Sequence, residues 1–70
     1  MMPLGLAELG KKYTIQRVGG KPEVRKHLEN IGFVPGSAVI VMNSIGGNLI
    51  VNVKEVRVAI SHEMAAKIMV

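Results

Sequence analysis

The side chains that could bind a metal ion are few and scattered in this 70-residue sequence. Glu23 and His27 are four residues apart, a spacing that places two ligands on the same side of a helix. His62 begins a His-Glu pair like the first half of the H-E-x-x-H zinc motif, but Ala66 stands where the second histidine is required. Because no third ligand lies near Glu23, His27 or His62, we expect solvated side chains there, and a metal only at a surface or shared contact. We expect no cofactor.

The residue types that enzymes use as nucleophiles are equally sparse. The chain has no cysteine, which excludes disulfides and thiolate metal sites, and it has no aspartate to orient a histidine. The segment Val18–Pro22 resembles a phosphate-binding loop, but Ile15 and Pro22 replace the glycine and the hydroxyl residue of a P-loop. The sequence therefore predicts a protein that is not an enzyme.

Charge and apolar content point to binding rather than catalysis. The net charge is +4, from nine Lys and Arg against five Glu, and no basic run exceeds two residues. A basic balance permits nucleic-acid binding, but only two residues are aromatic, and single-strand binders stack bases on aromatic rings. Hydrophobic residues make up 49% of the chain, which fits either a partner-binding patch or scattered exposure.

The longest unbroken apolar run has five residues, from Ala38 to Met42, whereas a membrane span needs about twenty. No secretory signal is visible at the N-terminus. We expect one soluble, cytoplasmic domain over residues 1–70, with no insertion into a membrane.

The elements that must position these residues are mostly short strands. Alternation of apolar and polar residues predicts strands, and a 3.6-residue apolar period predicts a helix over Pro22–Asn30 with Val24, Leu28 and Ile31 on its buried face. The pattern favours a mainly β fold with short helices: a small barrel of about five strands, one helix after the first strand and a short helix before the last. The expected segments are an opening helical turn at 6–9, strands at 13–18, 38–43, 49–53, 56–60 and 68–70, and a second helix at 62–67 capped by Ser61.

The link between the helix and the next strand carries the clearest local signal. Gly32 stands where a helix commonly ends on a left-handed residue, and Phe33 follows as the apolar contact back onto the last turn. Val34-Pro35-Gly36-Ser37 fits a type II turn, with Pro at the second position and Gly at the third. We interpret this link as a device of shape rather than of chemistry.

These same residues carry a resemblance to a known family. The spacing R-x-x-L-x-x-x-G-x-x-P-G, together with the order of strands along nearly the whole chain, resembles FeoA, ferrous iron transport protein A. Here that motif comprises Arg25, Leu28, Gly32, Pro35 and Gly36. The resemblance implies an SH3-like barrel and a small cytoplasmic partner of FeoB, the membrane ferrous iron transporter with a cytosolic GTP-binding domain. It brings no catalytic or metal-ligand set. One departure is Lys54-Glu55, where the family often has Gly, so the type of that turn stays open while Val53 and Val56 are still expected to pair.

The sequence is therefore compatible with two kinds of function. The first is an accessory module of iron uptake that binds FeoB and modulates it, through an apolar contact flanked by basic residues; a weak homodimer is also compatible with the sequence. The strand at 38–42 is apolar on both faces, so the predicted contact residues are Val39, Val41, Met42, Ile45 and Ile50. The alternative is a small basic barrel that binds nucleic acid, or a metal-responsive domain like that of iron-dependent repressors.

Overall fold

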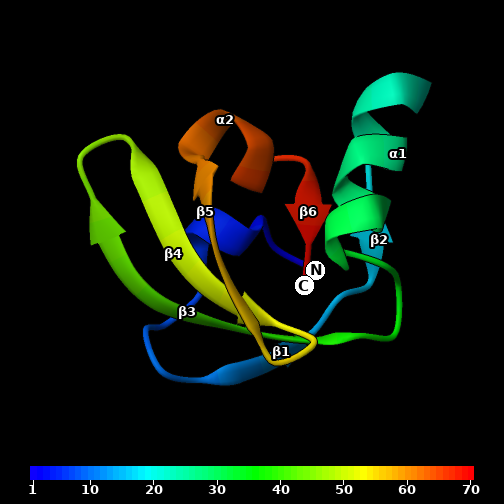
Figure 1. The fold of residues 1–70 in the computed structure, drawn as a ribbon. Helices are drawn as coiled ribbons and strands as arrows, with labels where there is room; N and C mark the ends of the chain where they lie inside the picture. Colours follow the sequence, from blue (N-terminus) through cyan, green and yellow to red (C-terminus); the bar gives the residue numbers. More distant parts are fainter.

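The computed structural model describes residues 1–70 and contains six short strands, two α-helices and one 3₁₀ turn (Figure 1). The strands form two sheets: a four-stranded antiparallel sheet in the order β1-β3-β4-β5, and a two-stranded sheet of β2 and β6. This is the mainly β fold with short helices that the sequence predicts. In chain order the elements are η1 (Leu4–Leu6), β1 (Lys12–Thr14), β2 (Arg17–Val18), α1 (Pro22–Ile31), β3 (Ala38–Ile45), β4 (Asn48–Val53), β5 (Val56–Ser61), α2 (His62–Ala65) and β6 (Ile68–Met69).

The single strand expected over residues 13–18 is two strands that belong to different sheets. Ile15 donates its backbone N–H to Ser37, beside β3, at 2.9 Å, and the next residue donates to Met69 of β6 at 2.8 Å. The chain thus leaves one sheet for the other between consecutive residues. This change of partner explains why six strands are present where about five were expected.

The end of α1 confirms the predicted cap. Gly32 has φ 126°, and its N–H bonds to the Glu29 carbonyl at 3.0 Å, while the Phe33 N–H bonds to the Leu28 carbonyl at 2.9 Å. These two bonds form a Schellman motif, which satisfies carbonyls that the helix leaves unpaired. The accompanying apolar contact is present as well, because Leu28 and Phe33 are both fully buried.

The predicted type II turn follows directly. The Ser37 N–H bonds to the Val34 carbonyl at 3.1 Å, and Gly36 has φ 92° at the third position. Pro35 precedes it with the φ that its ring imposes. Cap and turn together reverse the chain within a few residues and direct it into β3, one of the two central strands of the four-stranded sheet.

The β4–β5 connection has an unusual backbone for its residues. Val53 pairs with Val56, as expected, so the loop has two residues, Lys54 and Glu55. Both have positive φ, 50° and 64°, which is the geometry of a type I′ hairpin turn. Neither residue is a glycine, so the turn holds side chains where glycine or asparagine is usual.

The last segment confirms the second capped helix, although it is shorter than predicted. The Ser61 hydroxyl accepts the N–H of Met64 at 3.1 Å, and α2 ends at Ala65 rather than 67. The two termini lie together (Figure 1), with Met2 and Val70 exchanging backbone hydrogen bonds of 2.8 Å. The opening turn lies at Leu4–Leu6, not 6–9.

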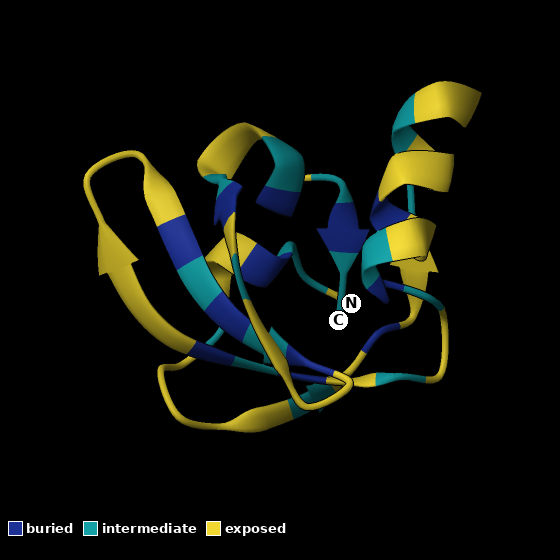
Figure 2. Cartoon of the chain, viewed as in Figure 1, coloured by how far each residue is buried: buried dark blue, intermediate teal, exposed yellow.

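The core lies between the two sheets and the helices (Figure 2). Side chains of β3, β4, α1 and α2 meet there, and no buried side-chain polar atom lacks a partner. The expected alternation in β5 is only partly present, because Val56 remains 53% exposed at the hairpin end. Neither helix has the length and apolar content of a membrane span. The buried residues are Leu4, Ile15, Leu28, Phe33, Val39, Val41, Leu49, Val51, Val53, Ile60, Ala65 and Ile68.

Candidate functional site

The three candidate metal ligands are not brought together. Glu23 and His27 are exposed on α1, and His62 is the exposed first residue of α2. The Nε2 atom of His62 lies 3.4 Å from the Ser44 hydroxyl, which is a hydrogen bond between strand and helix. No three side chains among the His, Cys, Asp and Glu residues are grouped closely enough to hold an ion.

Two of the five predicted contact residues are core residues. Val39 is 0% exposed and Val41 is 2% exposed, so neither side chain can contact a partner. Both pair with inward-facing valines of β4, Val53 and Val51 respectively. Strand β3 does have two apolar faces, as expected. Val39 and Val41 lie on the face toward the core, and the other face contacts solvent.

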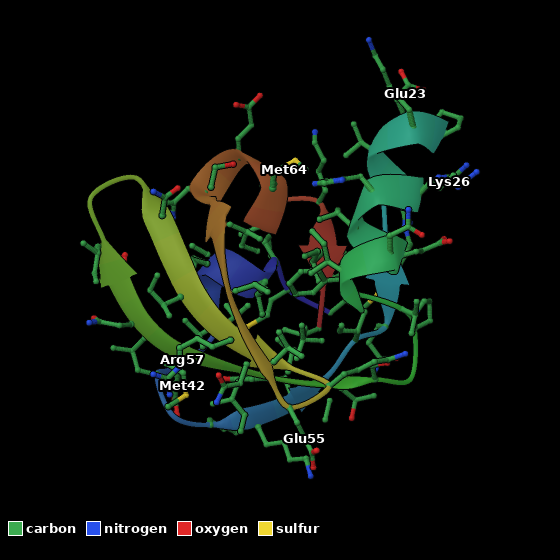
Figure 3. All side chains as sticks on the ribbon, in the orientation of Figure 1. Glu23, Lys26, Met42, Glu55, Arg57 and Met64 are labelled. Carbon is green, nitrogen blue, oxygen red and sulfur yellow. The ribbon has the colours of Figure 1, made fainter.

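The opposite side of the four-stranded sheet carries apolar side chains, and its isoleucines are each paired across the strands with Asn43, Asn48 or Asn52. We call this side the outer face: it consists of the side chains of β3, β4 and β5 that point away from the core. Ile40 and Ile50 are half-buried there, while Met42 is 40% and Ile45 is 59% exposed. Figure 3 shows Met42 projecting from β3 on the side away from α2. The other apolar members are the small residues Ala38 and Ala59.

The register of the sheet explains how these side chains come together. Before residue 42 the outward positions of β3 are even-numbered, as in Ile40, which pairs with Asn52. A bulge between Val41 and Asn43 inserts one residue, after which the outward positions are odd-numbered, as in Ile45. Met42 is the inserted residue, and the bulge is what brings Ile45 onto the same face as Ile40 and Ile50.

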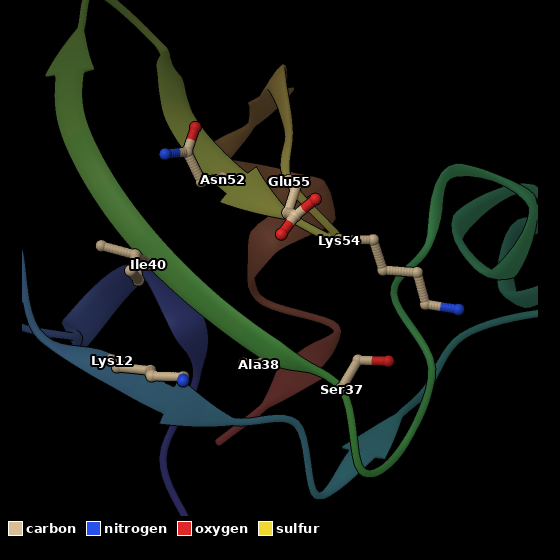
Figure 4. Close-up of a pocket in the computed structure, with 7 residues that line it drawn as sticks. All are labelled: Lys12, Ser37, Ala38, Ile40, Asn52, Lys54 and Glu55. Atoms are coloured by element: carbon tan, nitrogen blue, oxygen red, sulfur yellow. The ribbon is translucent and has the colours of Figure 1, made fainter.

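Basic side chains border the outer face. A shallow pocket of about 430 Å³ lies at one end of the outer face, between β1, β3 and the β4–β5 turn (Figure 4). Lys12 lies on its margin, whereas the Lys54 side chain runs from the pocket toward α1 (Figure 4). Arg57 lies farther along β5, where its Nε donates to the Asn52 side chain at 3.4 Å. An apolar centre with cationic margins fits a protein surface with apolar and acidic groups. The pocket is lined by Lys12, Ser37, Ala38, Ile40, Asn52, Lys54 and Glu55.

Sequence reasoning missed Ile40, Ala59 and the flanking Lys12 and Lys54 as members of this surface. Alternation shows that Ile40 and Val39 face opposite sides of a strand, but it does not show which side the core covers. Ala59 could have been found from the pairing of β5 with β4, because its partner Ile50 was already a candidate.

The residues of the family-like motif have structural roles, apart from one. Leu28, Gly32, Pro35 and Gly36 form the helix end and the turn described above. Arg25 is exposed on α1, and its backbone N–H bonds to the carbonyl of Lys21 in the first turn. No further contact in the structure accounts for the Arg25 side chain.

Comparisons with known proteins identify solved structures with a similar fold. The fold is similar to that of a crystal structure described as an iron uptake regulatory protein (FeoA), with 29% identity, 97% of this chain and 92% of that one covered, and a TM-score of 0.88. It is also similar to FeoA of Chlorobium tepidum, with 24% identity over 97% of this chain and 67% of that one, and a TM-score of 0.88. A comparison with curated protein sequences gave no match.

A third structure is FeoA of Stenotrophomonas maltophilia in complex with zinc, described as a prokaryotic SH3 domain protein. It is 23% identical, with 99% of this chain and 88% of that one covered and a TM-score of 0.85, and it supports the SH3-like fold expected above. The FeoA domain model matches residues 2–70, that is, nearly every residue. This chain therefore belongs to the FeoA domain family.

Proposed function

We propose that this protein is a cytoplasmic accessory protein of ferrous iron uptake that binds and modulates a FeoB-type transporter, and is not an enzyme. Membership of the FeoA family supports the link to iron transport. The S. maltophilia relative is itself described as possibly acting as a ferrous iron transport activating factor. The partner is the cytosolic region of the transporter, and the surface that binds it is the outer face.

The observation that carries this proposal is the exposure of large apolar side chains on that face. Met42 and Ile45 remain 40% and 59% exposed, although the chain already has a filled core. Half-buried Ile50 lies on the same side of the sheet, where it is paired with Asn43 of β3. Exposed large apolar side chains surrounded by polar residues are typical of protein-binding surfaces.

The direct test is Ile50→Asp, with binding to the purified cytosolic region of the transporter measured by calorimetry. A charge at the centre of the outer face would have to be desolvated on docking, so we expect the affinity to fall at least tenfold, or by about 1.4 kcal/mol. The matched control is Leu6→Asp, which makes the same change of charge at a residue that is 71% exposed and lies in η1, outside the sheet.

Ile45→Asp is a second test variant that should keep the fold, because a side chain that is 59% exposed contributes little to the core. We expect Ile45→Asp and Ile50→Asp to weaken binding and Leu6→Asp to leave it unchanged. Folded Ile45→Asp protein that binds as tightly as wild type would show that the outer face is not the docking surface.

A further inference from the structure

Strand β5 has the longest unpaired edge in the molecule: all six of its residues lack a strand on that side, whereas β3 lacks one only beyond Val41. It is the last strand of the four-stranded sheet, and Figure 1 shows no strand beyond it. The other edges are blunted: β1 has three residues and begins at Lys12, next to Lys11, and β2 and β6 have two residues each. Strand β5 has six residues, V-R-V-A-I-S, with a single charge, Arg57. Proteins usually protect such edges with charges, bulges or covering loops, because unpaired edges accept another strand.

The register shows which backbone groups of β5 are free. The His62 N–H bonds to the Gly47 carbonyl at 3.0 Å, and in an antiparallel ladder the bonded pairs recur at every second residue. Hence Val56, Val58 and Ile60 bond to β4, whereas the N–H and C=O groups of Arg57 and Ala59 point away from it. No backbone hydrogen bond outside the regular elements involves Arg57 or Ala59.

We infer that this edge pairs antiparallel with β5 of a second copy of the same chain, about a two-fold axis at Val58. The backbone N–H and C=O of Arg57 then bond to the C=O and N–H of Ala59 in the second copy. The same two bonds form between Ala59 of the first copy and Arg57 of the second, which gives four backbone hydrogen bonds. The two four-stranded sheets become one continuous sheet, with both outer faces on the same side.

Self-pairing is favoured because this edge is complementary to itself in that register. Each Arg57 lies opposite the small, uncharged Ala59 of the other copy, so no like charges face each other directly. On the inner side, the 53% exposed Val56 comes to lie beside Ile60 of the other copy, and the half-buried Val58 beside its own equivalent. A contact of one strand pair is small, so we expect a dissociation constant of about 0.1–1 mM.

The test is sedimentation equilibrium of the whole chain alone, from about 20 μM to 2 mM, together with Ala59→Glu and Ala59→Arg. Ala59 is exposed, so both variants should keep the fold, which thermal unfolding checks. We expect the wild-type mass to rise from 7.5 kDa toward twice that value. Ala59→Glu should tighten the dimer severalfold at low salt by facing Arg57, and Ala59→Arg should weaken it severalfold by placing two arginines opposite each other.

A third variant tests the hydrogen bonds themselves. Ala59→Pro removes only the outward N–H and leaves the bonds to β4 intact, so it should be a folded monomer, whereas Ala59→Val keeps the N–H and should still dimerise. A wild-type chain that stays monomeric at 2 mM, or equal effects of the Glu and Arg variants, would overturn the inference. A mass beyond the dimer would overturn it too, since β5 would then be adding to a different edge. No transporter is present, so the result is independent of the proposed function.

Discussion

Replacing Glu55 with glycine should stabilise the protein, even though glycine usually destabilises a folded chain. Lys54 and Glu55 have φ values of 50° and 64°, in the left-handed region where a side chain crowds the following carbonyl. This crowding costs an L-residue about 1–2 kcal/mol. Glycine avoids it but loses about 0.5–1 kcal/mol more in chain entropy on folding. The difference is a net gain of about 0.5–1 kcal/mol for Glu55→Gly.

The choice of Glu55 over Lys54 follows from what each side chain contacts. The aliphatic stem of Lys54 lies over Gly32 at the end of α1, where a methyl group built on Gly32 would meet Lys54 Cδ at 3.4 Å. Replacing Lys54 would therefore remove packing as well as strain. Glu55 is exposed, so its replacement acts almost entirely through the backbone.

Thermal unfolding followed by circular dichroism measures the effect. For a chain of this size, 0.5–1 kcal/mol corresponds to a rise in Tm of about 2–8 °C. The matched control is Glu29→Gly, which removes the same charge from an exposed position in α1 and should lower Tm, because glycine costs up to about 1 kcal/mol in a helix. If Glu55→Gly lowers Tm as Glu29→Gly does, the turn is not strained and the reasoning is wrong.

Two further substitutions probe the ends of the helices by the same assay. Gly32→Ala should cost about 1–3 kcal/mol of folding free energy, because φ 126° is strained for alanine and the new methyl group contacts Lys54. The control Gly5→Ala should change Tm little, because the space around Gly5 is open. Equal Tm values for the two variants would contradict the cap assigned to Gly32. Ser61→Ala should cost about 1 kcal/mol by removing the acceptor of the Met64 N–H, and an unchanged Tm would mean that this cap contributes nothing.

The features that the sequence predicts well depend on neighbouring residues. Gly32 and the Pro35-Gly36 pair have backbone preferences that almost any fold must respect, and the structure confirms both the helix end and the turn. The Ser61 cap is local in the same way, since hydroxyl and N–H are three residues apart. Such contacts form within one turn of chain, so tertiary packing rarely overrides them.

The features that the sequence did not predict depend on contacts distant in the chain. Ile15 and Gln16 continue a strand-like pattern, yet one bonds toward β3 and the other toward β6, which no local preference encodes. The direction in which Val39 points is a similar case. Alternation separates the two faces of β3, but only the packing of residues distant in the chain, such as Leu28 and Ala65, into one cluster with Val39 decides which face is the core. The β3 bulge then moves Ile45 to the outer face by changing the phase of that alternation.

The central claim is that the outer face of the sheet docks on the transporter's cytosolic region. The most direct measurement is a titration of the isotope-labelled chain with that region, followed by the backbone amide resonances in NMR. We expect shift changes concentrated at Ile40, Met42, Ile45 and Ile50, with α1 unaffected. Changes confined to α1, or none at saturating concentrations of the transporter region, would contradict it.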